Sequence, residues 1–165
     1  MRRTLVACAV AVLALGPGAA VAAAPKKITS AGVGQVKLGM TFKQLRAKHL
    51  VGKLRKGCPL AENTRTARLR SPLRGAVNFT QSNPRLVNDI TIRGGAKARG
   101  VGIGDTLADI KAKFPKRKVD HTQESVFGLT FVHIPNKAHV KEQFAIDVNT
   151  KKITLIGVPF IAVCE

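Results

Sequence analysis

The sequence contains no tryptophan and no tyrosine, and seven phenylalanines supply its aromatic rings apart from histidine. Acidic residues are also scarce: nine stand against 28 lysines and arginines, which gives a formal net charge of +19. A charge of this size suits nucleic acid as a partner. Proteins that grip single strands usually stack the bases on aromatic side chains, however, and the lack of such residues makes nucleic acid a disfavoured partner.

Catalytic motifs are missing as well. The chain has no Gly-x-Ser-x-Gly sequence, no phosphate-binding loop of the Gly-x-x-x-x-Gly-Lys type and no His-Glu-x-x-His pair. Asp120, His121 and Glu124 form the one close group of acids and imidazole, from which a general acid–base pair could be drawn. A solvated connector explains these residues equally well. We therefore expect no catalytic residues, no cofactor and no enzyme, with a small secreted enzyme as the least favoured alternative.

Long apolar runs occur only at the start of the chain, where the first 23 residues have the features of a secretory signal peptide. Two arginines precede an apolar run over residues 5–15, and small residues offer a cleavage site after Ala22 or Ala23. The run is shorter than the stretch of about 20 residues that spans a membrane, and Cys8 stands too early in it to carry a lipid. We expect a secreted, extracellular protein that can associate with the cell wall, with no integral membrane segment after cleavage.

Only three cysteines are present, and removal of the signal peptide leaves Cys58 and Cys164. An even pair in an exported protein indicates a disulfide. In the chain-entropy model, closing a loop of this length stabilises a fold by on the order of 4 to 5 kcal/mol. The four histidines are scattered without the spacing of metal ligands, so we expect no metal site.

One motif occurs twice. Gly39 and Thr41 in the first half correspond to Gly104 and Thr106 in the second, and both pairs stand 65 positions apart, as do the apolar residues around them. Similarity at a fixed spacing indicates a repeated supersecondary unit. We therefore divide the chain into a signal peptide over 1–23, an extended lead-in over 24–31, a first repeat over 32–97 and a second repeat over 98–165.

Each copy of the motif predicts the start of a short helix. A glycine allows a bend, a threonine follows as the N-cap, and the residue three positions later completes a capping box with its side chain. The helices are expected to begin at Phe42 and Leu107, and Pro115 ends the second one. The capping residues are Thr41 with Gln44 and Thr106 with Asp109.

Alternating apolar residues predict strands after each helix. The expected strands cover residues 66–70, 75–80, 86–92, 127–132, 144–148 and 152–158. Residues 51–59 and 116–120 have the composition of basic connectors, and residues 94–100 that of a linker. Each unit is then a short helix followed by an antiparallel β-meander, with the helix covering one face of a sheet. The predicted fold class is α+β, with two tandem repeats.

Gly39-Met-Thr41 followed by a short helix, in tandem units of an exported chain, resembles the β-lactamase inhibitor protein (BLIP) fold and the related small SmpA/OmlA-type outer-membrane lipoproteins. Among these it is most similar to small secreted proteins of high-GC Gram-positive bacteria. The resemblance covers residues 32–164 and implies a curved antiparallel surface that binds proteins. It does not imply inhibition, because BLIP has a disulfide within each repeat and an aromatic, acidic binding face, whereas this chain has one cysteine in each repeat. No inhibitory residue is carried over.

The positive charge is concentrated in the first repeat. Residues 32–97 contain 14 lysines and arginines against Glu62 and Asp89, whereas residues 98–165 contain 10 against seven acids. Anionic wall polymers, lipid headgroups or an acidic protein are the natural partners of such a field. Arginine suits phosphate and carboxylate because its planar fork binds them bidentately. The candidate anion-binding residues are Lys53, Arg55, Lys56, Arg65, Arg68, Arg70 and Arg74.

These patterns favour a secreted, non-enzymatic binding module of the cell envelope, whose partner is an unknown protein or an anionic envelope polymer. A BLIP-like inhibitor of a secreted enzyme is an alternative. A basic surface that only maintains solubility also accounts for the charge. Strong sensitivity of the native association to salt would favour the polymer, and weak sensitivity would favour the protein.

We predict that Cys58 and Cys164 are joined in the secreted protein, because exported pairs of cysteines are usually oxidised. Alkylation of the native protein followed by intact-mass analysis should add no label before reduction and one label per cysteine after it. Cys58→Ser is the control, since it should leave Cys164 open to alkylation without reduction. Labelling of both cysteines in the unreduced native protein would contradict the pairing.

Overall fold

The computed structural model describes residues 24–58, 63–136 and 139–163, so the expected signal peptide and Cys164 lie outside the described residues. Strands make up 50% of the structure and helices 13%. The expected α+β fold of two helix-plus-meander repeats is therefore wrong: the described residues are mainly β-sheet and form two sheets and three short helices. Within the described part of the chain, no helix is both long enough and apolar enough to cross a membrane.

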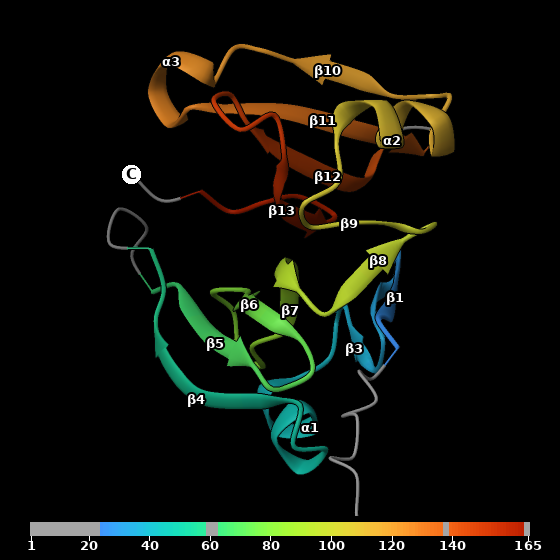
Figure 1. Cartoon of the computed structure of the whole chain (residues 1–165). Coiled ribbons are helices and arrows are strands. Elements are labelled where there is room, and N and C mark those ends of the chain that lie inside the picture. Colours follow the sequence, from blue (N-terminus) through green and yellow to red (C-terminus); the bar gives the residue numbers. More distant parts are fainter. Residues whose placement is uncertain (1–23, 59–62, 137–138, 164–165) are drawn as a thin grey trace, which may run out of the picture.

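The larger sheet has eight antiparallel strands, in the order β10-β11-β12-β13-β7-β6-β5-β4. In Figure 1 it runs from β10 at the top to β4 at the lower left, and β13 meets β7 in the middle. Ile156 of β13 pairs with Ile92 of β7, so one continuous ladder joins the two halves of the chain. The strands are β4 (Val51–Lys56), β5 (Arg65–Leu69), β6 (Arg74–Phe79), β7 (Val87–Gly94), β10 (Lys118–Asp120), β11 (Leu129–Asn136), β12 (His139–Asp147) and β13 (Ile153–Val158).

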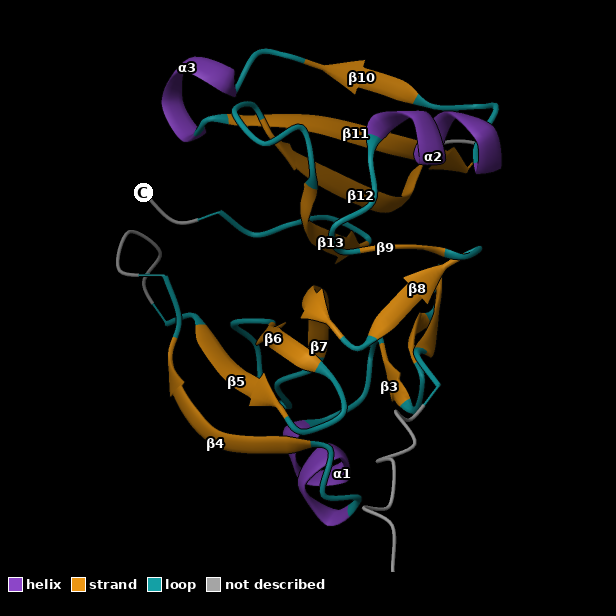
Figure 2. Ribbon diagram, in the orientation of Figure 1, coloured by secondary structure: helices purple, strands orange, loops and turns teal. Residues whose placement is uncertain are grey.

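A smaller sheet of five short strands, in the order β3-β2-β1-β8-β9, lies beside the larger one (Figure 2). Residues expected to be a lead-in form β1, and residues expected to be a linker form β8. These two strands are parallel, with Lys26 opposite Ala96, and the other neighbours are antiparallel. The strands are β1 (Lys26–Thr29), β2 (Gly32–Val33), β3 (Val36–Lys37), β8 (Ala96–Ala98) and β9 (Val101–Gly102).

Two of the helices start with a capping box. Thr41 Oγ1 accepts the Gln44 N–H at 3.1 Å, and Gln44 Oε1 accepts the Thr41 N–H at 2.8 Å. Thr106 and Asp109 make the same reciprocal pair. Each box satisfies two backbone N–H groups that a helix start leaves without partners. The helices are α1 (Phe42–Ala47), α2 (Leu107–Lys113) and α3 (Glu124–Phe127), and sequence reasoning assigned Phe127 to a strand instead.

Each capped helix is attached to one of the two central strands of the large sheet. The Gly39 N–H donates to the Val87 carbonyl oxygen of β7 at 2.9 Å, and the Gly104 N–H donates to the Ile153 carbonyl oxygen of β13 at 2.9 Å. The motif that occurs twice in the sequence therefore makes the same contact in both halves. It holds the start of a short helix against the middle of the sheet.

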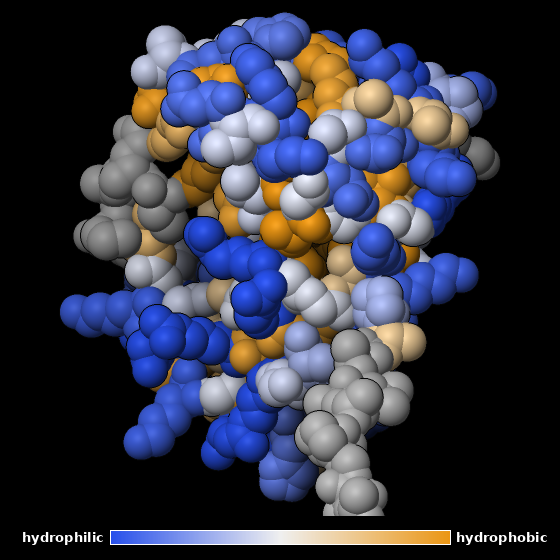
Figure 3. All heavy atoms as spheres, viewed as in Figure 1, coloured by the Kyte–Doolittle hydropathy of each residue, from blue (hydrophilic) through white to orange (hydrophobic). Residues whose placement is uncertain are grey.

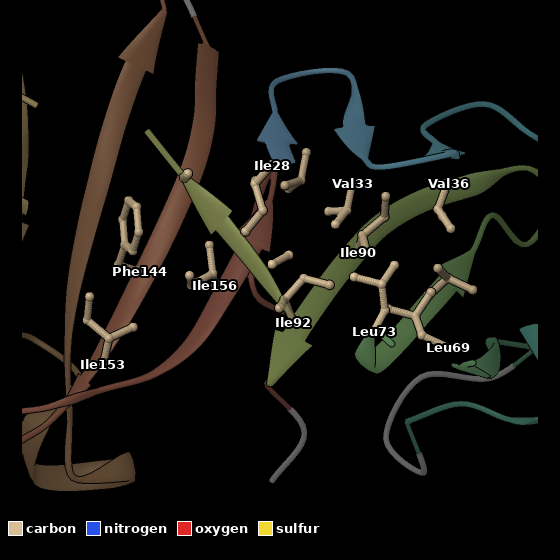
Figure 4. Packing of buried hydrophobic residues seen from close by; sticks show 14 of the residues in the cluster. Ile28, Val33, Val36, Leu69, Leu73, Ile90, Ile92, Phe144, Ile153 and Ile156 are labelled. Carbon is tan, nitrogen blue, oxygen red and sulfur yellow. The ribbon is translucent and has the colours of Figure 1, made fainter. Parts of the chain in front are cut away.

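The main core lies between the helices, the small sheet and one face of the large sheet. Leu45 of α1 and Ile110 of α2 are fully buried in it. In Figure 4 Val33 of the small sheet lies next to Ile90 of the large one, and Ile28, Val33 and Ile90 are all buried in the same cluster. Burial of each such side chain stabilises the fold by about 1.5 to 3 kcal/mol relative to its exposure. The short strands β1 and β2 are therefore held by packing more than by their few backbone hydrogen bonds.

The chain after β13 turns back over the opposite face of the large sheet. There Ile161 packs against a second apolar cluster on β11, β12 and β13. Its N–H donates to the buried Gln143 Oε1 at 2.6 Å. The backbone of Phe160 passes so close to β13 that a β-carbon at Gly157 would lie 2.3 Å from it. This C-terminal tail, residues 159–163, lies against β11, β12 and β13 on that face.

Gly95 and Gly100 have nearly the same left-handed backbone conformation, with φ angles of 81° and 88°. They can therefore be compared to test how closely the backbone packs at Gly95. A β-carbon at Gly95 would lie 2.0 Å from the Pro72 carbonyl oxygen, whereas one at Gly100 meets nothing within 4 Å. We expect Gly100→Ala to lower the free energy of unfolding by about 1 to 2 kcal/mol, the cost of a left-handed conformation. Gly95→Ala should cost about 1 to 3 kcal/mol more, because the Pro72 segment must move. Equal losses for the two variants in urea unfolding would contradict this contact.

Candidate functional site

The register of β4, β5 and β6 decides which basic side chains share a face. Leu54, Ala67 and Val77 stand opposite one another on the three strands and pack in the main core. Paired residues point to the same side of a sheet, and neighbours along a strand alternate between its sides. Arg55 and Arg68 therefore point away from the core, to the face on which the C-terminal tail lies.

Four of the seven predicted cations lie on this face or at its edge. Lys53 and Arg55 alternate with the half-buried Leu54 on β4, and Arg68 lies on β5. Arg70 follows just beyond the end of β5 and lies at the edge of this face. All four side chains are exposed. In Figure 3 hydrophilic side chains dominate the lower left of the surface, over β4 and β5. We call the group Lys53, Arg55, Arg68 and Arg70 the basic face.

The basic face is not neutralised by any acid that the structure describes. The ion pairs of the described residues have Lys97, His121 and His133 as their cationic partners. In the first half of the chain Asp89 is only 2% exposed, and Glu62 lies outside the described residues. The positive charge of the basic face is thus presented to solvent.

The other three predicted cations lie elsewhere. Lys56 pairs with Arg65. Each stands two positions from a core-facing residue, Leu54 or Ala67, so both belong to the side of the sheet opposite Arg55 and Arg68. Arg65 is half-buried, and its guanidinium donates to the preceding carbonyl oxygen at 2.9 Å. The Arg74 guanidinium lies over Gly94, where an added β-carbon would be 2.6 Å from its Nε. The seven residues expected to form one anion-binding face are therefore divided by the register of the sheet.

Asp89 belongs to the same face of the large sheet as Arg68, but its side chain is buried. Thr66, Asn78 and Asp89 stand opposite one another on β5, β6 and β7. Asn78 Nδ2 donates to the Asp89 carboxylate at 2.8 Å, and Asn88 Nδ2 donates to it at 3.3 Å. Burial raises the pKa of Asp89 above its ordinary value, and these two hydrogen bonds offset part of the rise. The sequence carried no signal for this acid beyond its place in an expected strand.

The acid and imidazole group of the sequence separates into two pairs. His121 Nδ1 lies 2.7 Å from Glu124 Oε1, and His133 Nε2 lies 3.5 Å from Asp120 Oδ2. Thr130 donates its hydroxyl to the same Glu124 oxygen that contacts His121. The Glu124 carboxylate therefore contacts both the Thr130 hydroxyl and the His121 ring. In a Ser-His-Asp triad the imidazole lies between the hydroxyl and the carboxylate, so the order of these three groups is different.

Both carboxyl groups of these pairs are held ionised. Hydrogen bonds lower the pKa of Glu124, with the Thr130 hydroxyl as the main cause and His121 next. The Thr122 hydroxyl and N–H lower the pKa of Asp120 in the same way. A pocket of about 400 Å³ adjoins Glu124, but an acid with a lowered pKa is a poor proton donor at neutral pH. Among the described residues, no group of three or more histidine, cysteine or acidic side chains is placed to hold a metal ion.

The remaining predicted residues lie apart from the basic face. Cys58 follows β4, is half-buried and is a free thiol in the structure. Its carbonyl oxygen accepts a hydrogen bond from the Thr64 hydroxyl at 3.3 Å. The expected partner Cys164 lies outside the described residues, so the disulfide stays a prediction. The four capping residues act at the starts of α1 and α2 and do not contribute to the basic face.

No protein-family model, curated protein or solved structure matches this chain. The resemblance to BLIP and to SmpA/OmlA-type proteins therefore stays an expectation from the sequence. No activity is transferred from a relative, and a functional proposal has to start from the geometry and charge of the described residues.

We predict opposite effects of pH on two carboxamide substitutions. Because burial raises the pKa of Asp89 above 3.8, the folded protein keeps this proton to higher pH than the unfolded chain does. Wild-type stability then falls as pH rises from about 3.8 through the folded-state pKa. The free energy of unfolding of Asp89→Asn should therefore increase relative to wild type between pH 3.5 and pH 7, as measured by urea unfolding at each pH.

Asp120→Asn is the matched control. Its pKa is lowered from 3.8 by the hydrogen bonds from Thr122, so Asp120 contributes stability that is present above 3.8 and lost as pH falls through the folded value. This variant should lose stability relative to wild type over the same rise in pH. If both variants changed in the same direction, the burial assigned to the Asp89 carboxyl would be wrong.

Proposed function

We propose that this protein is a non-enzymatic binding module of the cell envelope that holds an anionic polymer on its basic face. The observation that carries the proposal is the set of exposed cations on one face of two adjacent strands. The burial of Asp89 supports it, because this acid does not compete with an anion at the surface. The expected signal peptide supports an envelope location.

The spacing of the basic face suits a polymer with a charge on each repeating unit. Arg55 pairs with Thr66, so Arg68 is its diagonal neighbour on the next strand. Diagonal neighbours across a pair of strands lie about 7 to 8 Å apart, and residues two apart on one strand lie about 7 Å apart. One flexible chain of phosphates or carboxylates can therefore contact several of the four cations at once.

Affinity on such a surface depends on simultaneous contacts. One exposed ion pair contributes about 0 to 1 kcal/mol, because water and salt screen the charges and the side chains lose freedom. Arginine adds directional hydrogen bonds to phosphate or carboxylate, whereas Lys53 acts mainly as a point charge. Binding by this face should therefore weaken steeply as the salt concentration rises.

A protein partner is the second candidate, and the C-terminal tail favours it. Phe160 and Val163 are 40% and 39% exposed, and the tail lies on the same side of the large sheet as Arg68. Exposed apolar side chains beside a basic patch are suited to a protein surface with an apolar centre and an acidic rim. Such a complex would be much less sensitive to salt than polymer binding.

We expect the change of Lys53, Arg55, Arg68 and Arg70 to alanine to weaken binding to purified wall teichoic acid by about 30-fold at roughly 0.15 M salt. This equals about 2 kcal/mol for four exposed contacts. The slope of log affinity against log salt should fall by roughly one for each cation removed. Isothermal titration calorimetry at several salt concentrations gives both quantities.

The control changes Lys111, Lys113, Lys116 and Lys118 to alanine, which removes the same formal charge from exposed positions of the second half. It should alter the affinity less than about threefold. Equal losses in the two variants would mean that net charge alone acts, and no binding by wild type would remove the polymer proposal. Phe160→Ser should leave polymer binding unchanged, and a partner lost only with that substitution would favour the protein alternative.

A further inference from the structure

A pocket of about 250 Å³ opens between the two sheets, on the first half of the molecule. Its walls come from β1, from the β2–β3 turn and β3, from the residues that follow α1, and from the loop between β5 and β6. Val36, Leu50 and Leu73 supply apolar walls, and Val36 and Leu73 are buried. This volume is just below the range of about 300 to 1,000 Å³ that is usual for small-molecule sites.

Basic side chains surround this pocket, and none of the described residues that line it is acidic. Lys26, His49 and Arg70 line it together with the apolar residues, and all three are exposed. Their carbon stems can follow the apolar walls while their nitrogen atoms stay near the opening. A pocket with apolar walls and a cationic rim is complementary to an anion that carries an apolar group.

The second half of the chain offers an internal comparison. A pocket of about 200 Å³ lies there, and four of its seven lining residues stand 65 positions after lining residues of the first. Arg99 corresponds to Gly34, Phe114 to His49, Pro115 to Leu50 and Pro135 to Arg70. Both pockets therefore lie at the same place relative to the repeated sequence motif.

In the second pocket the charge of Arg99 already has neighbouring partners. Phe114 is only 2% exposed, and the Arg99 guanidinium lies 5.2 Å from the centre of its ring. The buried Glu142 carboxyl feels the charges of Arg99 and Lys141, which lower its pKa against the larger effect of burial. In the first pocket Gly34 stands in place of this arginine, and no described acid forms an ion pair with Lys26, His49 or Arg70. The cations of the first pocket are thus the ones without an acidic partner among the described residues.

We propose that the pocket of the first half binds a small amphiphilic anion, a carboxylate or phosphate attached to a short apolar chain. Arg70 can bind the head group bidentately, and Lys26 adds a second positive charge. The apolar chain packs against Val36, Leu50 and Leu73. This pocket does not rest on the function proposed above. It shares Arg70 with the edge of the basic face, because this residue lies just beyond the end of β5.

The test uses the mature chain labelled with ¹⁵N and titrated with octanoate or octyl phosphate, followed by the backbone amide signals in NMR spectra. We expect the amides of Gly34, Leu50 and Ser71 to shift, with a dissociation constant of about 0.1 to 1 mM for a ligand of this size. Octanol and acetate, which each lack one part of the ligand, should bind at least about tenfold more weakly. Comparison of octanoate with octyl phosphate shows which head group is preferred.

The variant Lys26→Ala/Arg70→Ala should weaken octanoate binding by about tenfold or more. Its control is Lys27→Ala/Arg68→Ala, which removes the same charge from neighbouring exposed positions and also takes one arginine from the basic face. The control should bind octanoate within about twofold of wild type. The spread of the amide signals reports that each variant is folded.

Several outcomes would overturn the proposal: no shifts near Gly34 and Leu50 at millimolar octanoate, equal loss of affinity in both variants, or octanol that binds as tightly as octanoate. Shifts at Phe114 and Lys116 of the second pocket that match those of the first would also overturn it, because octanoate would then bind both pockets equally. A failure of teichoic acid binding leaves these results unaffected, since the probe is a different molecule.

Discussion

The pairing of β13 with β7 is the contact on which the rest of the structure depends. Ile156 stands opposite Ile92 in this ladder, and both side chains are fully buried. Each of the two strands also accepts the N–H group that fixes the start of one capped helix, through the carbonyl oxygens of Val87 and Ile153. The C-terminal tail continues directly from β13. Loss of this ladder would therefore separate the halves, release both helix starts and remove the support of the tail.

Sequence alternation located most strands of the large sheet. β5, β6, β7, β12 and β13 all overlap the expected segments, because apolar residues at every second position must face the core. The same rule predicts a connector where β4 lies, since a bulge between Val51 and Leu54 breaks the alternation of this strand. The small sheet was missed because its strands have two to four residues and its central pair joins segments far apart in the chain. The fold class was wrong for this reason.

The basic face could be predicted only in part. The alternation around Ala67 places Arg68 and Arg70 together, but the same rule puts Arg65 on the other side of the strand. Lys53 joins the face only once β4 is known to be a strand. The burial of an acid between β6 and β7, and the pocket between the sheets, depend on how distant segments pack, and a periodic pattern in one segment contains no information on such contacts.

The parallel pairing of β1 with β8 has a consequence for the kinetics of folding. Lys26 stands opposite Ala96, so this pair closes a loop of 70 positions, whereas the hairpins of the large sheet close much shorter loops. Closing a long loop costs more conformational entropy than closing a short one, and the cost arises before the contact between its ends has formed. Local hairpins therefore form earlier than such a pair. We expect β1 to dock late and to be among the first segments that open in the native protein. A ligand held between Lys26 and the loop after β5 would slow that opening, and amide hydrogens of the small sheet would then exchange more slowly.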